Sequence, residues 1–402
     1  MEETIRIVRI SVRNLVEFIL REGDIDNRSS GGPDKDAMLM GGRLHRRIQR
    51  RMGPEYHAEV SLKMLVPCGE FAVQIEGRAD GIIIKEDTGY VTVDEIKGVL
   101  RELSHIERPV NVHLAQAKCY AYIYAEQHGL GLIGVQMTYC NLDTEEVKRF
   151  SETYTKQELK VWFEDLVRRY EKWARFQIEW EKERNRSIHG LEFPFPYRVG
   201  QREVAAAVYR TILRKKKLFI QAPTGVGKTI STVFPAVKAV GEGLGEKIFY
   251  LTAKTITRTV AEQAFRTLRE KGLSMKVITL TAKEKICFCE ETVCNPEACP
   301  YAKGHFDRVN DAVFDLITSG NEITRKAIEE QAHTYRVCPF ELALDISTWA
   351  DAVICDYNYV FDPAAHLKRF FSEGSSRDYI FLIDEAHNLV ERGREMYSAE
   401  LY

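Results

Sequence analysis

Apolar and polar positions in the first 154 residues follow the short periods of an α/β fold. Two β-rich runs, Phe71–Lys85 and Tyr90–Lys97, are joined by the turn-forming sequence Glu86–Gly89, which predicts a β-hairpin. Three further elements are predicted on the same grounds: helices over Leu44–Met52 and Val110–His128, and a strand over Leu132–Cys140. We therefore expect residues 1–154 to form an α/β domain.

A long charged helix follows this domain. The segment Thr155–Asn185 is amphipathic and rich in Lys, Arg, Glu and Trp, which predicts one helix ending near His189. Phe193–Pro196 contains two prolines, and prolines prevent the helix from continuing. Residues 155–192 are therefore interpreted as a connecting helix, and a second domain is expected over residues 193–402.

The second domain shows short apolar runs, which are typical of parallel strands buried on both faces. The runs are Leu218–Gln221, Lys247–Thr252, Val277–Leu280, Ala352–Asp356 and Tyr379–Ile383, and a helix is predicted over Ile230–Gly241. The pattern predicts a parallel sheet with helices between its strands.

Composition changes this picture little. The chain has 402 residues and a net charge of -2, so a nucleic-acid partner would need local basic patches. The stretches Arg43–Arg51 and Arg210–Lys217 are either such patches or solvated faces. No apolar run reaches the roughly 18 residues of a membrane span, and the N-terminus lacks the apolar core of a signal peptide. We expect a cytoplasmic protein without a membrane partner.

A phosphate-binding loop lies between a predicted strand and a predicted helix. Ala222–Thr229 matches the phosphate-loop pattern, with Ala222 at the usual position of the first glycine. Glycines let backbone N–H groups turn toward phosphate oxygens, Lys228 is expected to reach the β and γ phosphates, and Thr229 to bind magnesium. The predicted nucleotide-binding residues of the loop are Ala222, Thr224, Gly225, Gly227, Lys228 and Thr229.

Acidic residues follow the last predicted strand. The sequence Asp384–His387 (DEAH) comes directly after Tyr379–Ile383, and a carboxylate at the carboxyl end of a strand can face a phosphate loop. Asp384 is expected to bind magnesium and Glu385 to orient and deprotonate the attacking water. His387 completes the predicted catalytic set. The alternative for this string alone is a solvated helix start.

With these motifs, residues from about 193 to 402 resemble a superfamily 2 DEAH helicase of the XPD/DinG type. Three more segments carry the resemblance: Tyr197–Arg202 as the adenine-reading motif, Leu251–Thr255 as the single-stranded DNA motif, and Cys355–Pro363 upstream of the acids. The resemblance implies a RecA-like domain, ATP and Mg²⁺ as cofactors, and Arg198 and Gln201 as further nucleotide-binding residues. It also implies ATP-dependent helicase activity on single-stranded or branched DNA, in repair or recombination.

The helicase family resembled here uses a second motor domain, which closes over the nucleotide and supplies arginines to the γ-phosphate. Only 15 residues follow His387. We therefore expect the 402-residue chain alone to bind ATP, to hydrolyse it very slowly and to unwind nothing. It would be a fragment, a truncated product, or one half of a motor completed by a second chain.

Five cysteines gather between two predicted strands. Cys287, Cys289, Cys294, Cys299 and Cys338 lie within 52 residues, and without a signal peptide such a cluster favours a metal site over disulfides. Thiolates suit either iron–sulfur or zinc, and buried free thiols are the remaining alternative. When Cys289 is left out, the gaps of six, four and 38 residues are unlike the short paired spacings of a zinc ribbon.

The XPD/DinG resemblance implies a [4Fe–4S] cluster in this interval, within a cysteine-rich insertion over about residues 284–342. Its ligands would be Cys287, Cys294, Cys299 and Cys338. Cys289 is the rival for the first ligand. We favour Cys287 because Lys283–Cys287 resembles the family's sequence before its first ligand.

The N-terminal hairpin carries a second chemical constellation. Asp80 is expected at the end of its β run, and Glu95 and Lys97, two apart in the next strand, share a face. Two carboxylates to hold Mg²⁺ or Mn²⁺ and a lysine to stabilise negative charge are the minimum for metal-assisted phosphodiester cleavage. Gln116 and Tyr120 share a face of the following helix.

His45, on the earlier helix, is a further candidate ligand. Taken in order, these residues resemble the RecB-type PD-(D/E)XK nuclease superfamily over roughly Arg13 to Cys140. The resemblance implies a restriction-endonuclease-like α/β domain, with His45, Asp80 and Glu95 around Mg²⁺ or Mn²⁺. A Glu-x-Lys pair alone is commonly a surface ion pair, and this region lacks the cysteine quartet of some RecB-type nucleases.

Two other interpretations remain open. One is a nucleic-acid-binding ATP switch with an inactive nuclease fold, which a nuclease assay with magnesium or manganese would distinguish. The other is a non-helicase P-loop ATPase with a zinc insert, which iron content and stimulation of ATP hydrolysis by single-stranded DNA would distinguish.

Overall fold

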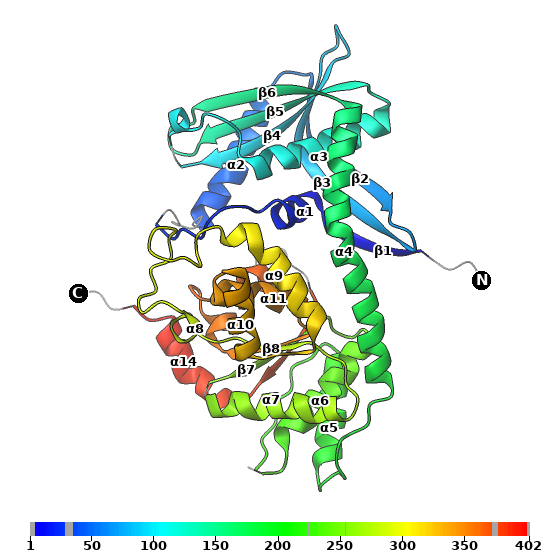
Figure 1. The fold of residues 1–402 in the computed structure, drawn as a ribbon, viewed down its shortest axis with the longest axis vertical. Helices are drawn as coiled ribbons and strands as arrows, with labels where there is room; N and C mark the ends of the chain where they lie inside the picture. Colours follow the sequence, from blue (N-terminus) through cyan, green and yellow to red (C-terminus); the bar gives the residue numbers. More distant parts are fainter. Residues whose placement is uncertain are drawn as a thin grey trace. The chain divides into compact units, whose positions relative to one another are not determined.

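The computed structural model describes residues 5–28, 35–100, 102–223, 225–253, 255–371 and 377–399, with the backbone alone at 35–41 and 255–256. It divides into two compact units, Met1–Gln177 and Ile178–Tyr402, and the division falls within helix α4 (Lys156–His189; Figure 1). None of the described helices combines the length and the apolar character that crossing a bilayer requires.

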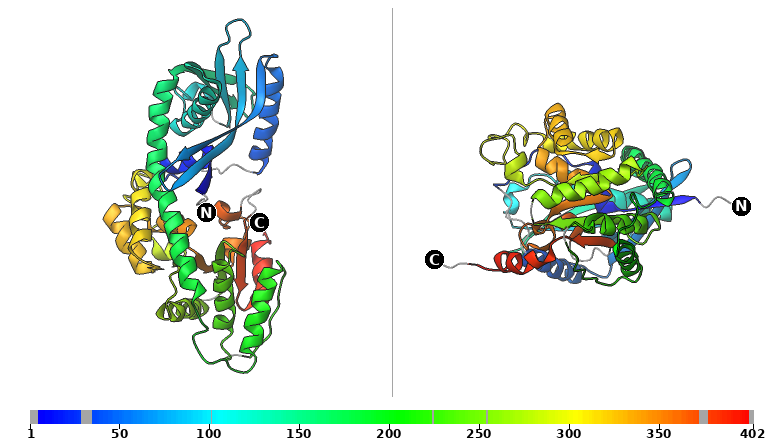
Figure 2. Two further views of the ribbon diagram at one scale, coloured as in Figure 1. Left: turned by 90° about the vertical axis from the view of Figure 1, so that its right-hand side faces the viewer. Right: turned by 90° about the horizontal axis from the view of Figure 1, so that it is seen from below.

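In the first unit, six strands of the described residues form one mixed sheet of order β1-β3-β4-β5-β6, with β2 paired to β3. The strands are β1 (Arg6–Ser11), β2 (Tyr56–Pro67), β3 (Phe71–Ile84), β4 (Val91–Val99), β5 (Leu132–Asn141) and β6 (Val147–Thr155). The pairs β1–β3 and β4–β5 are parallel, and the other pairs are antiparallel. The long β2–β3 ribbon is visible in the left view of Figure 2.

The helices of the first unit are α1 (Val12–Ile19), α2 (Lys35–Arg51), α3 (Asn111–His128) and the first part of α4, with a 3₁₀ turn at Leu103–His105. Helix α3 packs on the sheet, mainly on β4 and β5 (Figure 1), and buries Cys119, Tyr120 and Ile123. Helix α4 begins with a reciprocal cap: the Thr155 N–H donates to the Glu158 carboxylate (2.8 Å), and the Glu158 N–H donates to the Thr155 hydroxyl (3.2 Å).

The predicted hairpin is confirmed, because β3 and β4 pair in antiparallel fashion and Lys85 and Tyr90 close the turn between them. The prediction that Asp80 ends its strand is wrong. The β3–β4 ladder starts only at Gly81, and the following residues of β3 pair with both β2 and β4. This double pairing extends β3 to Ile84, so Asp80 lies inside the strand.

In the second unit, five strands of the described residues form a fully parallel sheet of order β11-β7-β10-β8-β9. They are β7 (Lys247–Thr252), β8 (Val277–Thr279), β9 (Glu322–Ile323), β10 (Ala352–Asp356) and β11 (Tyr379–Ile383). Four of the predicted apolar runs are therefore parallel strands, and β9 was not predicted. Side chains of α6 and α7, including Val233 and Phe265, share a buried core with Ile248 of β7 and Ile354 of β10.

The helices of this unit are α5 (Gln201–Leu213), α6 (Lys228–Gly241), α7 (Thr255–Glu270), α8 (Lys283–Ile286), α9 (His305–Ser319), α10 (Arg325–Tyr335), α11 (Pro339–Trp349), α12 (Asn358–Phe361), α13 (Lys368–Phe371) and α14 (Leu389–Met396). Helices α8 to α11 lie between β8 and β10 along the chain, in the interval that holds the cysteines. A 3₁₀ turn, Ala386–Asn388, precedes α14.

The prediction of a strand at Leu218–Gln221 is wrong for this structure. The segment has no strand pairing, and Phe219 is 90% exposed. A strand needs a hydrogen-bonded neighbour, and the described partner of the nearest sheet edge, β11, is β7 alone. Apolar character identified the segment, but the pairing that makes a strand is a tertiary property.

A buried carboxylate, that of Asp351, links the second part of α4 to the rest of the second unit. Asp351, just before β10, accepts hydrogen bonds from Trp180 Nε1 (2.9 Å), the Arg184 guanidinium (2.8 Å) and the Lys276 backbone N–H (2.8 Å). Because charge-assisted bonds to a buried group are strong, this half of the helix belongs to the core of the second unit.

Candidate functional site

The phosphate loop leads directly into helix α6. Gly225 and Gly227 adopt left-handed backbone conformations, with φ of 79° and 74°, which only glycine adopts without strain. Helix α6 starts at Lys228, so its free N–H groups and positive dipole end lie at the loop, as anion binding requires. Ala222 is half-buried beside the loop, and Thr224 lies outside the described residues.

The acids after β11 lie beside this loop, as predicted. Strand β11 pairs with β7, and the Asp384 N–H donates to the Leu251 carbonyl oxygen (3.0 Å). The Lys228 ammonium lies 3.6 Å from a Glu385 carboxylate oxygen. The loop lysine and the predicted catalytic acid, 157 positions apart in the sequence, therefore share one site.

Tyr250 of β7 connects the two predicted magnesium ligands. Its phenol group is buried beside the side chains of both Thr229 and Asp384. Burial raises the pKa of Asp384, and the neighbouring Glu385 charge raises it further. A bound cation would offset this cost, so the donor set fits a magnesium ion. Sequence reasoning missed Tyr250, whose strand position gave no chemical signal.

His387, the last residue of the acidic motif, is the most exposed of the set. Its Nδ1 lies 3.4 Å from a Glu385 carboxylate oxygen, and its side chain is 73% exposed. The residue therefore lies at the rim of the ATP site, where it contacts Glu385 and solvent. Lys254 of the predicted DNA-contacting segment lies outside the described residues.

Arg198 and Gln201 hold the backbone of the loop. Gln201 Nε2 donates to the Val226 carbonyl (2.7 Å), its Oε1 accepts from the Arg198 N–H (2.8 Å), and the Arg198 guanidinium donates to the Gly225 carbonyl (2.6 Å). A Cβ at Gly227 would lie 2.4 Å from Gln201 Nε2. These residues therefore shape the loop, and Gln201 retains one N–H and one lone pair for a nucleotide base.

Glu385 itself is held in a strained conformation. It is a non-glycine residue in the left-handed region (φ 50°, ψ 46°), which costs about 1–3 kcal/mol. The fully buried Tyr357 places its hydroxyl against this turn, where it donates to the Asp384 carbonyl and lies 3.1 Å from the Glu385 carbonyl. Tyr357 is thus a positioning residue for the catalytic acid.

Replacing Tyr357 by phenylalanine should lower kcat for ATP hydrolysis about fivefold, because one hydrogen bond worth roughly 1 kcal/mol is lost. KM for ATP should change less than twofold, since Lys228 is untouched. The matched control is Tyr359→Phe, which removes a hydroxyl that contacts Thr281 at 3.5 Å instead. Steady-state kinetics measure the separate effects on kcat and KM. Equal effects on kcat and KM, or equal effects of Tyr357→Phe and Tyr359→Phe, would contradict a positioning role.

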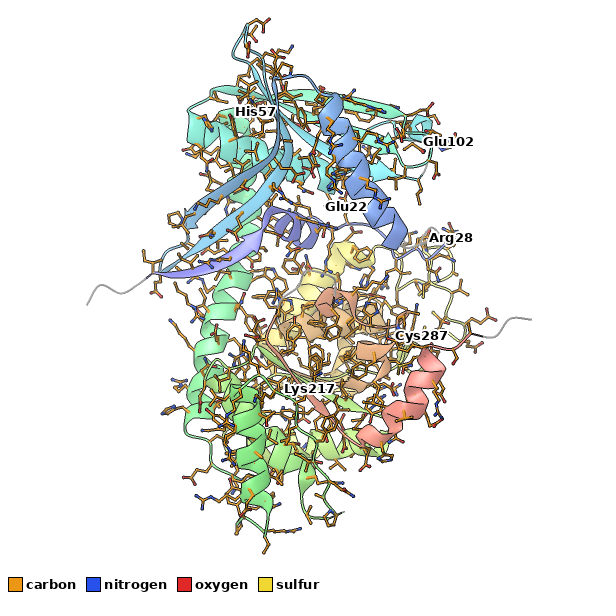
Figure 3. All side chains as sticks on the ribbon, turned by 180° about the vertical axis from the view of Figure 1, so that it is seen from behind. Glu22, Arg28, His57, Glu102, Lys217 and Cys287 are labelled. Carbon is orange, nitrogen blue, oxygen red and sulfur yellow. The ribbon has the colours of Figure 1, made fainter. Side chains whose placement is uncertain are left out.

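The cysteines of the predicted cluster lie close together in pairs. Cys289 Sγ is 3.7 Å from Cys299 Sγ and is also hydrogen-bonded to Cys287 (labelled in Figure 3). The Lys283 ammonium is hydrogen-bonded to Cys294 and lies near Cys338. Burial raises the pKa of Cys338 to about 11. Among the described residues, no group of three or more His, Cys, Asp or Glu has a metal-binding arrangement.

In the first unit, the structure brings together all six residues predicted from the sequence. His45 Nδ1 lies 3.5 Å from Asp80 Oδ1, and the Ile96 N–H donates to Asp80 Oδ2 (2.7 Å). Lys97 Nζ donates to Glu95 Oε1 (2.8 Å) and to Gln116 Oε1 (3.1 Å).

The Gln116 side chain lies beside Tyr120, whose hydroxyl lies near the Arg78 backbone. Both residues are buried. The Gln116 amide oxygen accepts a hydrogen bond from Lys97, and its side chain lies beside Tyr120. Gln116 therefore fixes the Lys97 ammonium beside Glu95. The two helix residues therefore orient the lysine of the candidate site.

Glu95 is the residue of this cluster whose environment is most suited to a cation. Its side chain is 2% exposed, and its Oε2 is buried without a hydrogen-bond partner. Burial raises the pKa of Glu95 to about 8, and the Asp80 charge contributes to the increase. An unsatisfied buried carboxylate is costly. Asp80, Glu95 and His45 offer the oxygen and nitrogen donors that a divalent ion uses, although their described positions do not form a metal-binding group.

One supporting residue of this cluster was missed by sequence reasoning. Gln49 of α2 donates to the Asp80 backbone carbonyl (2.9 Å). It lies four residues after His45, so both project from one face of the helix. The four-residue spacing between His45 and Gln49 was the sequence feature that could have identified this residue.

Comparison with known proteins places two family matches in the second unit. Residues 202–314 match the model described as DEAD/DEAH box helicase, and residues 274–402 match DEAD_2. Both spans include residues of the second unit only. The matches support the prediction of a DEAD/DEAH-type helicase domain in this part of the chain.

Several curated proteins are similar to this chain. Regulator of telomere elongation helicase 1 of Homo sapiens is 21% identical over 264 residues, which cover 52% of this chain and 21% of that protein. Its Caenorhabditis elegans homolog is 24% identical over 256 residues, covering 52% and 25%. The Gallus gallus Fanconi anemia group J protein homolog is 36% identical over 63 residues, covering 16% and 5%. The chain thus spans about a quarter or less of these relatives.

Solved structures give a weaker likeness. An XPD helicase is 20% identical, with a TM-score of 0.33, covering 49% of this chain and 34% of that one. A truncated XPD is 22% identical, also with a TM-score of 0.33, covering 46% and 52%. The fold assignment therefore rests on the parallel sheet and the loop described above.

Proposed function

We propose that the second unit is the ATP-binding domain of an ATP-dependent DNA helicase of the XPD/DinG type, which acts on single-stranded or branched DNA in repair or recombination. One observation carries the proposal: the Lys228–Glu385 contact of 3.6 Å, in a region that matches DEAD/DEAH helicases. A phosphate-loop lysine that lies beside the glutamate of the DEAH sequence is an arrangement that fits phosphoryl transfer to water.

The residues of this site have separable tasks. Lys228 would exchange its contact with Glu385 for phosphate oxygens, which frees the Glu385 carboxylate for water. Asp384 and Thr229, already joined through Tyr250, would hold magnesium. Magnesium, when bound, neutralises developing charge on the phosphate oxygens. Arg198 and Gln201 would keep the loop carbonyls turned away from the nucleotide.

We further propose that the cysteines between β8 and β10 hold a [4Fe–4S] cluster. Four thiol donors suit such a cluster, and the Lys283 ammonium beside Cys294 supplies a positive charge that favours thiolates. The ligands would be Cys287 or Cys289 together with Cys294, Cys299 and Cys338.

Serine at Cys294, Cys299 or Cys338 should each abolish iron binding and loosen this segment, because a metal site contributes folding energy. Of Cys287→Ser and Cys289→Ser, one should lose iron and the other should be mild, and we expect Cys287 to be the ligand. Metal analysis and absorbance after anaerobic purification measure this, with Cys68→Ser in the first unit as the control. Zinc in place of iron would contradict the cluster.

For the first unit we propose a metal-dependent nuclease. The unsatisfied Glu95 Oε2 supports this proposal most directly. Asp80 and Glu95, with His45 beside them, would hold Mg²⁺ or Mn²⁺, and a bound ion supplies a Lewis acid and an activated water. Lys97, fixed by Gln116 and Tyr120, would face the negative charge that develops on the scissile phosphate.

A cleavage assay tests this function: the purified protein is incubated with single-stranded DNA and Mn²⁺, and products are resolved by length. Shortened products in Mn²⁺, and none with a chelator, would support the proposal. A folded protein that binds no metal and cleaves nothing would leave a nucleic-acid-binding domain without nuclease activity.

A further inference from the structure

Helix α2 carries a row of arginines beside the candidate metal site. Arg43, Arg46 and Arg50 follow a spacing of three and four residues and are exposed. Residues at that spacing share one side of a helix. The row, here called the arginine stripe, spans about 10 Å at 1.5 Å per residue.

The other faces of α2 have assigned partners. Leu44 and Ile48 are buried in a cluster with Ile96 of β4. His45 and Gln49 face Asp80, one through its carboxylate and the other through its backbone carbonyl. At about 100° per residue, the stripe lies about a third of a turn from the His45 and Gln49 face, on the side away from the buried face.

The remaining arginines of the helix share one carboxylate. Arg47 and Arg51 both pair with Glu145, the second at 3.5 Å. By contrast, none of the ion pairs among the described residues involves the stripe; Arg46 Nε makes one hydrogen bond, to the Gly42 carbonyl (3.2 Å). Within the described residues, the helix therefore presents positive charge without an ion-pair partner, about a third of a turn from the face that carries His45 and Gln49.

We propose that the arginine stripe binds the backbone phosphates of single-stranded DNA and guides the strand to the metal site. The proposal rests on the proposed nuclease function and names its substrate-binding surface. Arginine suits phosphate because its planar fork donates two hydrogen bonds at once. A row about 10 Å long is long enough to contact more than one backbone phosphate of the same strand.

The test compares two double variants of the full chain, Arg46→Gln/Arg50→Gln and Arg47→Gln/Arg51→Gln. Each removes two positive charges from one helix, but only the second removes guanidinium groups that pair with a described carboxylate, Glu145. Binding of a fluorescein-labelled 30-nucleotide oligo(dT) is followed by anisotropy between about 50 and 200 mM salt, with a chelator to prevent cleavage. The stripe variant should reduce the salt slope by about 1.4, since each phosphate contact in a single strand contributes about 0.7.

A second readout is local. An arginine-specific dicarbonyl reagent should label Arg43, Arg46 and Arg50 less when the oligonucleotide is bound, whereas Arg13, which pairs with Glu17 on α1, should label equally. Three outcomes would overturn the proposal. They are equal salt slopes of DNA binding for both variants, no protection of the stripe from labelling, and displacement of the DNA by polyglutamate at equal charge. Calorimetry with Mn²⁺ distinguishes DNA binding by the stripe from the proposed nuclease activity. Protection of the stripe without Mn²⁺ binding would support the DNA-binding surface and refute the metal-dependent nuclease.

Discussion

Alanine in place of Lys228 is expected to weaken ATP binding about ten- to hundredfold. The lysine contributes a charge-assisted contact to phosphate, worth roughly 1.5–3 kcal/mol, and each 1.4 kcal/mol is about tenfold in affinity. Calorimetric titration with ATP and Mg²⁺ measures the change. The control is Lys217→Ala, an exposed lysine before the loop (labelled in Figure 3), which should bind ATP like the parent protein.

Glu385→Gln should give the opposite pattern from Lys228→Ala. Because Glu385 contacts Lys228 before the nucleotide arrives, its neutralisation frees the lysine, and ATP affinity should hold or increase. Hydrolysis should fall by about 10²–10⁴, the usual contribution of a general base. An unchanged ATP affinity in Lys228→Ala would show that the loop is not the nucleotide site.

Asp80→Ala and Lys97→Ala are expected to abolish DNA cleavage in Mn²⁺ without unfolding the protein. Asp80→Ala removes a proposed ligand of the ion, so Mn²⁺ binding should vanish in this variant. Lys97→Ala removes only the positive charge that stabilises the developing negative charge, so Mn²⁺ binding should persist. Loss of cleavage should be about 10²–10³-fold or more for the lysine.

The matched control for these variants is Glu76→Gln, an exposed carboxylate on the same strand β3. It should cleave DNA at the parental rate. Calorimetry with Mn²⁺, circular dichroism and the cleavage assay together decide the outcome. Cleavage that survives Asp80→Ala would come from another site or a contaminant.

Much of the fold could be predicted because local patterns agree with it. The β3–β4 hairpin followed from two apolar runs and a Gly-containing turn, and four apolar runs became the parallel strands β7, β8, β10 and β11. The long-range arrangement could not be predicted, because a parallel strand order depends on pairing between distant segments. The unpaired Leu218–Gln221 and the extended β3 are results of that pairing.

The candidate sites show the same division. Spacing along single elements identified the residues proposed to contact phosphate or metal, such as Lys228, Asp384 and Glu95. The supporting residues were missed because their roles arise only in three dimensions. Tyr357 reaches backbone carbonyls 27 and 28 positions later, and Tyr250 joins two separate motifs. Neither residue type has a spacing that indicates such a task.

The most direct test of the central claim, that the second unit is a helicase-type ATP domain, is the rate of ATP hydrolysis with and without single-stranded DNA. We expect slow hydrolysis that DNA accelerates and that Glu385→Gln abolishes in both conditions. A rate with DNA that equals the Glu385→Gln background, measured while calorimetry shows ATP bound, would contradict it.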